Sequence, residues 1–216
     1  MILSPSVLSA DFTILGRQLD ILYENGIDHI HYDIMDGHYV PPVSFGEEIL
    51  KCIRKRYPDL YVDAHLMVEN PESHFESLKE AGADSITVHA EVCSDLRKTV
   101  EKIQSLGMKA GVTVNPETGT EAIEDVFDIA DLVLIMSVHP GYGGQKLIPE
   151  CLDKVRRIAE LKKRNGYRFS IQIDGGVGLS NLSDVIAAGA DNIVAGSAVF
   201  RNDISKNIKD FMEVMK

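Results

Sequence analysis

The chain has 216 residues, of which 44% are hydrophobic and 25% are charged, and its formal net charge is −11 at pH 7. This size and composition suit one globular α/β domain, so we predict a single domain spanning residues 1–216. An acidic chain lacks the clustered basic footprint of a nucleic-acid-binding protein. No apolar run approaches the length that crosses a membrane, so no membrane partner is expected.

The start of the chain and its cysteines indicate a cytoplasmic location. Residues 1–5 have neither a basic region nor a long apolar stretch, so no signal peptide is visible. Cys52, Cys93 and Cys151 are odd in number and lack the spacing of a metal site. These features are typical of a reduced, cytoplasmic compartment.

Apolar, β-branched segments alternate with amphipathic ones along the whole chain, which predicts strands that alternate with helices. The predicted strands cover residues 2–9, 28–34, 61–67, 85–89, 109–114, 132–137, 168–174 and 192–196. The predicted helices cover residues 11–25, 44–57, 71–81, 95–106, 117–129, 149–165, 179–188 and 204–215. Asp11 is the predicted N-cap of the first helix, and Gly26 occupies the position that ends it.

The strand-then-helix unit therefore occurs eight times. Strict alternation demands parallel strands joined by crossover helices. A helix end closed by glycine, then an aspartate and an apolar strand, recurs at residues 25–28, 81–84 and 188–191. Eight units within this length favour a closed (β/α)8 barrel, the TIM-barrel fold, over an open doubly wound sheet. In such barrels the active site lies at the C-terminal ends of the strands.

Polar side chains mark several of these strand ends. His31 and Asp33 lie two residues apart in the second strand and so share a face, while His65 and Asp174 lie at the ends of the third and seventh strands. Two imidazoles and two carboxylates that meet at one barrel mouth can hold a divalent transition metal. We therefore predict one metal site with zinc, or alternatively iron, manganese or cobalt. Buried polar pairs without a metal are the competing interpretation.

Three other polar residues near the mouth have simpler interpretations. Asp63 lies two residues before His65 and is predicted to orient that imidazole rather than to bind metal. His89 ends the fourth strand and belongs either to a polar rim or to the ligand set. His139 falls in a loop and is expected to face solvent or substrate.

Glycines follow each of the last three predicted strands. They lie in residues 140–145, at Gly175-Gly176 and at Gly196-Ser197. Such glycines let backbone N–H groups approach an anion, and barrels frequently bind phosphate on these loops. The alternative is tight turns without a ligand. No Gly-Lys-Ser/Thr is present, which excludes a nucleotide P-loop. A phosphate anchor beside a metal indicates a small phosphorylated, oxygen-rich substrate.

Six blocks of residues resemble the ribulose-phosphate 3-epimerase family, in the family's order and from the first strand to the last. They are LSPSVLSAD at 3–11, DIMDGH at 33–38, HLMV at 65–68, MSV at 136–138 with the glycine-rich loop after it, DGGV at 174–177 and VAGSA at 194–198. The resemblance implies a phosphate-binding (β/α)8 barrel and an isomerase that interconverts D-ribulose 5-phosphate and D-xylulose 5-phosphate. It also implies a homo-oligomer, either a dimer or a hexamer.

The resemblance also implies roles for individual residues. The metal ligands are again His31, Asp33, His65 and Asp174. The implied substrate contacts are Ser6, His65, Gly141, Tyr142, Gly143, Gly144, Asp174, Gly175, Gly176, Gly196 and Ser197. An apolar cap that restricts water around the intermediate would consist of Met35, Met67 and Met136, for which simple core filling is the alternative.

Inversion at carbon 3 of a ketose phosphate requires removal of a proton next to a carbonyl and return of a proton to the opposite face. A metal bound to substrate oxygens stabilises the resulting enediolate. Two carboxylates on opposite sides of the substrate can act as base and acid. We predict Asp33 as the proton acceptor and Asp174 as the donor, with exchanged roles in the reverse direction.

Some positions depart from the family pattern. His139 stands where the family usually has Asn, Tyr142 where it has Phe, and residues 40–46 replace a more usual Pro-Asn start. Residues 115–118, Asn-Pro-Glu-Thr, resemble the allulose-6-phosphate 3-epimerases, so D-allulose 6-phosphate is the alternative substrate. A lyase or decarboxylase would want a lysine at one of these strand ends, and none carries one. From another class, a non-catalytic sugar-phosphate sensor is the alternative.

Overall fold

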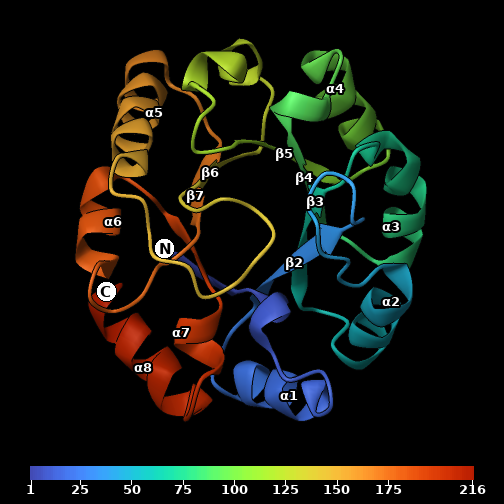
Figure 1. Ribbon diagram of the computed structural model, residues 1–216, viewed down its shortest axis with the longest axis vertical. Coiled ribbons are helices and arrows are strands. Elements are labelled where there is room, and N and C mark those ends of the chain that lie inside the picture. The colour runs from blue at the N-terminus through green and yellow to red at the C-terminus, as the bar shows by residue number, and fades with distance from the viewer.

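Eight parallel strands alternate with helices in the computed structural model, which describes residues 1–216 (Figure 1). The strands are β1 (Ile2–Pro5), β2 (His29–Met35), β3 (Tyr61–Met67), β4 (Ser85–His89), β5 (Lys109–Val114), β6 (Leu132–Met136), β7 (Ser170–Asp174) and β8 (Asn192–Ala195). All eight predicted strands are present, and β3, β4 and β5 begin and end at the predicted residues. The first strand was predicted over residues 2–9 but ends at Pro5, and Val7–Ser9 form a 3₁₀ turn.

The strands form one sheet that nearly closes on itself. Each strand pairs in parallel with its neighbours, in the order β1-β8-β7-β6-β5-β4-β3-β2. A parallel bridge between Ser6 and His31 joins the two remaining edges, just beyond the end of β1. The predicted (β/α)8 barrel is therefore confirmed.

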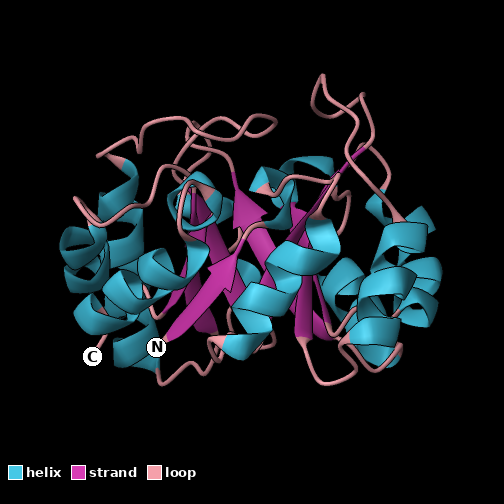
Figure 2. Cartoon of the chain, turned by 90° about the horizontal axis from the view of Figure 1, so that it is seen from below, coloured by secondary structure: helices cyan, strands magenta, loops and turns pink.

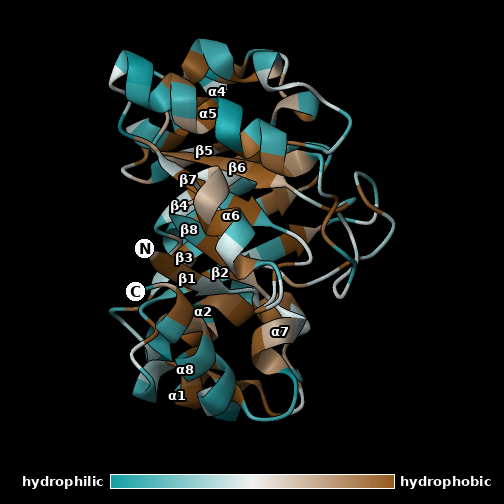
Figure 3. Ribbon diagram, turned by 90° about the vertical axis from the view of Figure 1, so that its left-hand side faces the viewer, coloured by the Kyte–Doolittle hydropathy of each residue, from teal (hydrophilic) through white to brown (hydrophobic).

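Helices surround the barrel and turn their apolar faces toward it (Figure 3). In α2, for example, Leu50 and Ile53 are buried, whereas Lys51 and Lys55 are exposed, as expected of an amphipathic helix. The helices are α1 (Leu15–Glu24), α2 (Glu47–Arg56), α3 (Phe75–Ala81), α4 (Leu96–Ser105), α5 (Cys151–Asn165), α6 (Leu182–Ala188), α7 (Ser197–Phe200) and α8 (Ile204–Val214). None of these helices combines the length and the apolar character that a membrane span requires.

The first helix begins later than predicted. The carboxylate of Asp11 accepts hydrogen bonds from the backbone N–H and the hydroxyl of Thr13, so it closes a turn, and α1 begins only at Leu15. The competing local bond explains the difference, because an aspartate can satisfy a turn as readily as a helix end. Gly26 has a φ of 80°, which agrees with its predicted place at the end of the helix.

The prediction of a regular helix over residues 117–129 is wrong. This segment forms only two short 3₁₀ turns, Thr120–Ala122 and Glu124–Val126. The ammonium of Lys154 in α5 donates hydrogen bonds to the carbonyl oxygens of Asn115, Pro116 and Thr118 at 3.0, 2.7 and 2.7 Å. A distant side chain thus binds the Thr118 carbonyl and the two carbonyls just before the segment, whose start forms a loop. The short helix α7 was not among the predicted elements.

The two ends of the barrel differ in their connections. Figure 2 shows long loops beyond the C-terminal ends of the strands and shorter turns at the opposite end. At the short end, Asp84 accepts a hydrogen bond from the Val62 N–H at 2.7 Å, and Asp191 accepts one from the Ile171 N–H at 2.8 Å. In these two copies of the repeat, the aspartate therefore binds a backbone N–H group near the start of a neighbouring strand. The long loops leave the opposite end free to form a site.

Candidate active site

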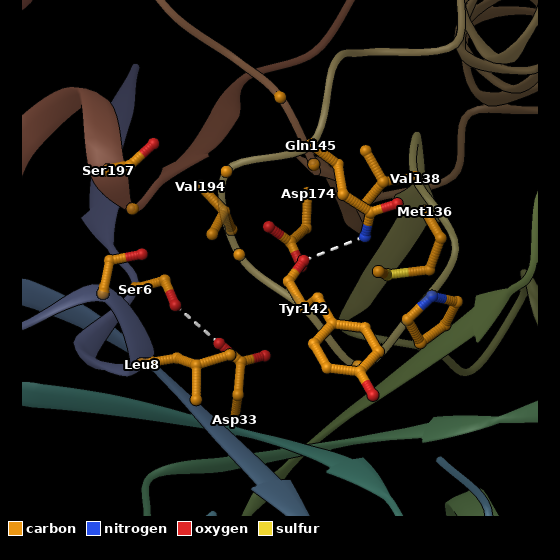
Figure 4. Close-up of a pocket in the computed structure, with 18 of the residues that line it drawn as sticks. Ser6, Leu8, Asp33, Met136, Val138, Tyr142, Gln145, Asp174, Val194 and Ser197 are labelled. Atoms are coloured by element: carbon orange, nitrogen blue, oxygen red, sulfur yellow. Dashed lines mark hydrogen bonds between the residues drawn. The ribbon is translucent and has the colours of Figure 1, made fainter. Parts of the chain in front are cut away.

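A pocket opens at the C-terminal ends of the strands (Figure 4). Most of the predicted substrate contacts line it, namely Ser6, Gly141, Tyr142, Gly143, Gly144, Asp174, Gly175, Gly176, Gly196 and Ser197. His65 does not line it, because this imidazole is fully buried beneath the pocket floor. Further lining residues that the sequence reasoning missed include Ser9, Gln145 and Val194. All three lie inside the recognised blocks and could have been found there.

The four predicted metal ligands meet at the base of this pocket. Asp33 Oδ1 lies 3.2 Å from His31 Nε2 and 3.0 Å from His65 Nδ1, and Asp174 Oδ2 lies 4.0 Å from His31 Nε2. One ligand atom from each of the four residues lies within 4.8 Å of all the others. Two imidazole nitrogens and two carboxylate oxygens so arranged fit a divalent transition metal. We call this group of residues the four-ligand cluster.

Strand register brings the cluster together. His31 and Asp33 alternate onto the same face of β2, and the parallel register places Asp33 opposite His65 on β3. Asp174 ends β7 and reaches in from another part of the barrel wall. Because three different strands supply the ligands, the cluster exists only when the barrel is closed.

Charges within the cluster oppose the effect of burial. Burial raises the pKa of Asp33, but His31 and His65 outweigh it and hold that pKa well below its usual range. Burial, followed by the charge of Asp33, raises the pKa of Asp174 to about 7. Burial lowers the pKa of His31, yet Asp33 and Asp63 outweigh it and raise this pKa well above its usual range. Burial lowers the pKa of His65.

Asp63 backs His31 rather than His65, so its predicted role is wrong. Asp63 Oδ2 lies 2.9 Å from His31 Nδ1, and the parallel register pairs these two residues directly. The same carboxylate accepts hydrogen bonds from Ser85 and Gln172 in the barrel interior, both at 2.9 Å. The error has a simple cause, because spacing within one strand cannot reveal which neighbour on the next strand lies opposite.

His65 is backed by His89 instead. The Nε2 atoms of the two imidazoles lie 2.9 Å apart, and the hydroxyl of Tyr39 lies 2.9 Å from His89 Nδ1. His89 is completely buried, so it does not belong to a polar rim, and it is not a member of the four-ligand cluster. Burial lowers the pKa of His89 to about 4. Nothing in the sequence indicated this contact of Tyr39, because Tyr39 lies in the loop after β2, far from His89 in the chain.

The carboxylate of Glu91 lies at the outer end of these contacts. Its Oε2 is 3.4 Å from His89 Nδ1, and its Oε1 accepts a hydrogen bond from the Asn115 N–H at 2.8 Å. Burial raises the pKa of Glu91, but contacts with His89 and Thr118 outweigh it and lower the pKa to about 2. Glu91 is therefore a carboxylate at neutral pH.

The glycines on the other side of the pocket combine free backbone donors with close packing. The N–H groups of Gly143, Gly144 and Gly176 donate no hydrogen bond within the chain. Gly176 has a φ of 67°, and a Cβ atom there would lie 2.2 Å from the Leu147 nitrogen. At Gly196 a Cβ atom would lie 2.3 Å from the Ser9 hydroxyl. The loop after β7 thus approaches the loop after β6, and the loop after β8 approaches the loop after β1, more closely than side chains would permit.

The loop after β6 crosses the mouth of the barrel (Figure 1). The Gln145 amide donates to the carbonyl oxygens of His139 and Tyr142 at 2.7 and 2.9 Å, which holds the loop in shape. His139 is 63% exposed and lies 3.1 Å from Glu117, in keeping with its predicted position in an open loop.

Three methionines form an apolar part of the pocket wall. Met35, Met67 and Met136 are almost completely buried and all line the pocket. They come from the ends of β2, β3 and β6, close to the four-ligand cluster. Thioether side chains here give the pocket a polarizable surface that cannot hold water strongly.

Comparison with known proteins agrees with this arrangement. A family model described as "Ribulose-phosphate 3 epimerase family" matches residues 2–200. The chain is 43% identical over 215 residues to "Ribulose-phosphate 3-epimerase" from Aquifex aeolicus (strain VF5), which covers 99% of this chain and 96% of that protein. It is 44% identical over 209 residues to the protein of the same name from Bacillus subtilis (strain 168), with 96% of each chain covered.

Solved structures share the fold. A 3-hexulose-6-phosphate synthase from Salmonella typhimurium superposes with a TM-score of 0.74 at 19% identity, covering 100% of this chain and 98% of that one. KGPDC from Streptococcus mutans in complex with D-R5P superposes with a TM-score of 0.71 at 14% identity, covering 99% and 96%. The family model and the close relatives extend over nearly the whole chain. The chain therefore belongs to the ribulose-phosphate 3-epimerase family, an enzyme family of isomerases.

Proposed function

We propose that the protein is a metal-dependent 3-epimerase that interconverts D-ribulose 5-phosphate and D-xylulose 5-phosphate. The relatives that share 43–44% of its residues carry that name. The observation that carries the proposal is the placement of two carboxylates, Asp33 from β2 and Asp174 from β7, which enter one pocket from different sides (Figure 4). Epimerisation needs one group on each face of the reacting carbon.

His31, Asp33, His65 and Asp174 would hold one divalent metal. The two imidazole ligands favour zinc, with iron, manganese and cobalt as alternatives. When bound, the metal supplies positive charge that stabilises the negative charge developing on the substrate oxygens. Three of these ligands, His31, Asp33 and His65, are buried, and Asp174 is partly exposed to the pocket.

Asp33 takes the proton from carbon 3, and Asp174 returns a proton to the opposite face. The Ser6 hydroxyl donates a hydrogen bond to Asp33 Oδ2 at 2.6 Å and holds that carboxylate at the pocket floor. In the reverse direction the two carboxylates exchange roles, because the reaction passes through the same intermediate. The methionine wall restricts water, which limits protonation from solvent.

The substrate phosphate occupies the opposite side of the pocket. The free N–H groups of Gly143, Gly144 and Gly176 are donors of the kind that bind a phosphate dianion. A guanidinium nitrogen of Arg201 lies 3.4 Å from where a Cβ of Gly144 would be, so positive charge is near. The carbon chain of the sugar then extends from the phosphate at these glycines to carbon 3 at Asp33 and Asp174.

A five-carbon substrate is favoured over D-allulose 6-phosphate. The segment that suggested the longer sugar begins with Asn115, whose side chain donates to the Tyr39 hydroxyl at 2.7 Å and does not line the pocket. Kinetic comparison of D-ribulose 5-phosphate with D-allulose 6-phosphate tests this choice. A higher kcat/KM for the six-carbon sugar would replace the proposed substrate.

Solvent exchange tests the activity itself. In D₂O, the enzyme should introduce deuterium at carbon 3 of D-ribulose 5-phosphate, while a non-catalytic sensor would bind the sugar without exchange. We further propose a single catalytic domain, a homo-oligomer (a dimer or a hexamer) and a cytoplasmic location. Sedimentation analysis and cell fractionation test the last two.

A further inference from the structure

A line of buried contacts leads from the four-ligand cluster to a carboxylate at its outer edge. We propose that Glu91, acting through His89, fixes the tautomer of His65 so that the Nδ1 lone pair of His65 faces the metal. Glu91 and His89 are then positioning residues that bind neither metal nor substrate. This inference rests on the proposed metal-dependent function.

Hydrogen bonds join the inner groups, and a longer ion-pair contact reaches Glu91. His65 Nδ1 faces the cluster, 3.0 Å from Asp33 Oδ1, and His65 Nε2 lies 2.9 Å from His89 Nε2. On the far side of the second ring, His89 Nδ1 lies 3.4 Å from Glu91 Oε2. Both imidazoles are completely buried, so water does not substitute for either partner.

The protonation pattern follows from the chemistry of each group. A neutral imidazole has one N–H donor and one acceptor nitrogen, whereas a carboxylate only accepts. Glu91 therefore favours the proton of His89 on Nδ1, which makes His89 Nε2 an acceptor. That acceptor requires His65 to carry its proton on Nε2. The remaining nitrogen, His65 Nδ1, then presents a lone pair to the cluster.

No other neighbour of His89 favours the tautomer that carries its proton on Nδ1 over the other tautomer. The Tyr39 hydroxyl, 2.9 Å from His89 Nδ1, can donate or accept and so suits either tautomer. Asp33, at the cluster, favours the opposite tautomer, because its Oδ1 would accept a proton from His65 Nδ1. With that proton in place, His65 could not bind a metal. Glu91 thus acts against Asp33, as does His31, whose Nε2 lies 3.2 Å from His65 Nδ1 and can donate to it when His31 is protonated.

The same logic acts on the other histidine ligand, but directly. Asp63 Oδ2 lies 2.9 Å from His31 Nδ1, which leaves His31 Nε2 toward the cluster. A carboxylate therefore backs each histidine, and one additional imidazole separates Glu91 from His65. Partners of this kind raise metal affinity by holding a ligand in its binding orientation and tautomer.

The test compares Glu91→Gln with the wild-type protein. An amide can either donate or accept, so this variant keeps the shape of Glu91 but loses its preference. Glu47→Gln is the matched control, because Glu47 also lies 3.4 Å from a histidine Nδ1, that of His74, on the outer helical layer. Two readouts are needed: histidine tautomers from long-range ¹H–¹⁵N NMR of the metal-free protein, and the zinc dissociation constant from competition with a chelating dye.

In the wild type and in Glu47→Gln we expect protons on His89 Nδ1 and His65 Nε2. In Glu91→Gln we expect loss of this single pattern and a zinc affinity lower by about 10- to 100-fold. Glu91→Ala, measured in the same way, should show a loss at least as large. A wild-type protein with its proton on His65 Nδ1, or a Glu91→Gln variant with unchanged tautomers and zinc affinity, would overturn the inference.

The two readouts separate this inference from the proposed function. If the wild-type protein binds no zinc, iron, manganese or cobalt, the metal-dependent function is wrong. The tautomers of the metal-free protein still decide whether Glu91 sets the state of His65. If metal binds and the tautomers do not depend on Glu91, only the positioning role is wrong.

Discussion

The two sides of the pocket are built from different parts of the polypeptide. On one side, the four-ligand cluster consists of side chains from β2, β3 and β7, of which all but the partly exposed Asp174 are buried. On the other side, which we call the glycine side, loop backbone from Gly143, Gly144 and Gly176 faces the pocket. Side chains held by strand register can perform chemistry, whereas packed loop backbone provides shape and N–H donors. Substitutions on the first side should therefore change turnover, and those on the second should change substrate binding.

The largest expected effect is that of Asp33→Asn. Loss of the proton acceptor should lower kcat by at least about 10³-fold, with little change in KM, because an amide cannot take the carbon-3 proton. The direct measurement is incorporation of deuterium from D₂O at carbon 3 of the substrate, which should stop in this variant. Asp28→Asn is the control, since Asp28 also contacts a histidine but lies at the opposite end of the barrel. Turnover that survives Asp33→Asn would assign the base elsewhere.

Removal of the metal should have the next largest effect. Dialysis against a chelator should reduce kcat to a few per cent or less and lower the melting temperature, since a ligand bound only by the folded state stabilises it. Zinc added back should restore both, as followed by activity and by metal analysis. Affinity should fall as pH decreases, because protons compete for the imidazole and carboxylate ligands. Full turnover by a protein in which metal analysis detects no bound metal would contradict the proposed role of the four-ligand cluster.

On the glycine side, Gly176→Ala should raise KM more than it lowers kcat. Gly176 has a φ of 67°, and a Cβ there would lie 2.2 Å from the Leu147 nitrogen, so the loops must separate. We expect KM to rise several-fold and the free energy of unfolding to fall by about 1–3 kcal/mol. Gly16→Ala in α1 is the control, because nothing lies within 4 Å of its Cβ position. An unchanged KM for Gly176→Ala would mean that this loop does not hold the phosphate.

The smallest effect on activity is expected at the far end of the barrel. Asp191→Ala removes the acceptor of the Ile171 N–H and should lower the free energy of unfolding by about 1–2 kcal/mol, with kcat and KM unchanged. Asp28→Ala occupies the same place in the repeat but binds only His29, so it should cost less. Denaturant titration and steady-state kinetics measure both. A change in kcat for Asp191→Ala would show that the two ends are coupled.

The barrel and the location of the cluster were predictable from the sequence. Hydrophobic periodicity revealed each strand. Strict alternation of strands with helices requires parallel strands joined by crossover helices. Once the strands are parallel, their C-terminal ends meet at one mouth. His31, Asp33, His65 and Asp174 therefore had to approach one another, whatever the details of the loops. The glycines after β6, β7 and β8 follow predicted strands, so their position at the same mouth was also predictable.

Only the tertiary structure decided which groups support the cluster. Register between strands placed Asp63 opposite His31 instead of beside His65, and a loop from β2 brought Tyr39 to His89. Lys154, from the following helix, bound three carbonyls at and just before the start of the predicted helix over 117–129. Periodicity is local and reports the face on which a residue lies. Partners across strands depend on register and on long-range packing, which the closed barrel alone specifies.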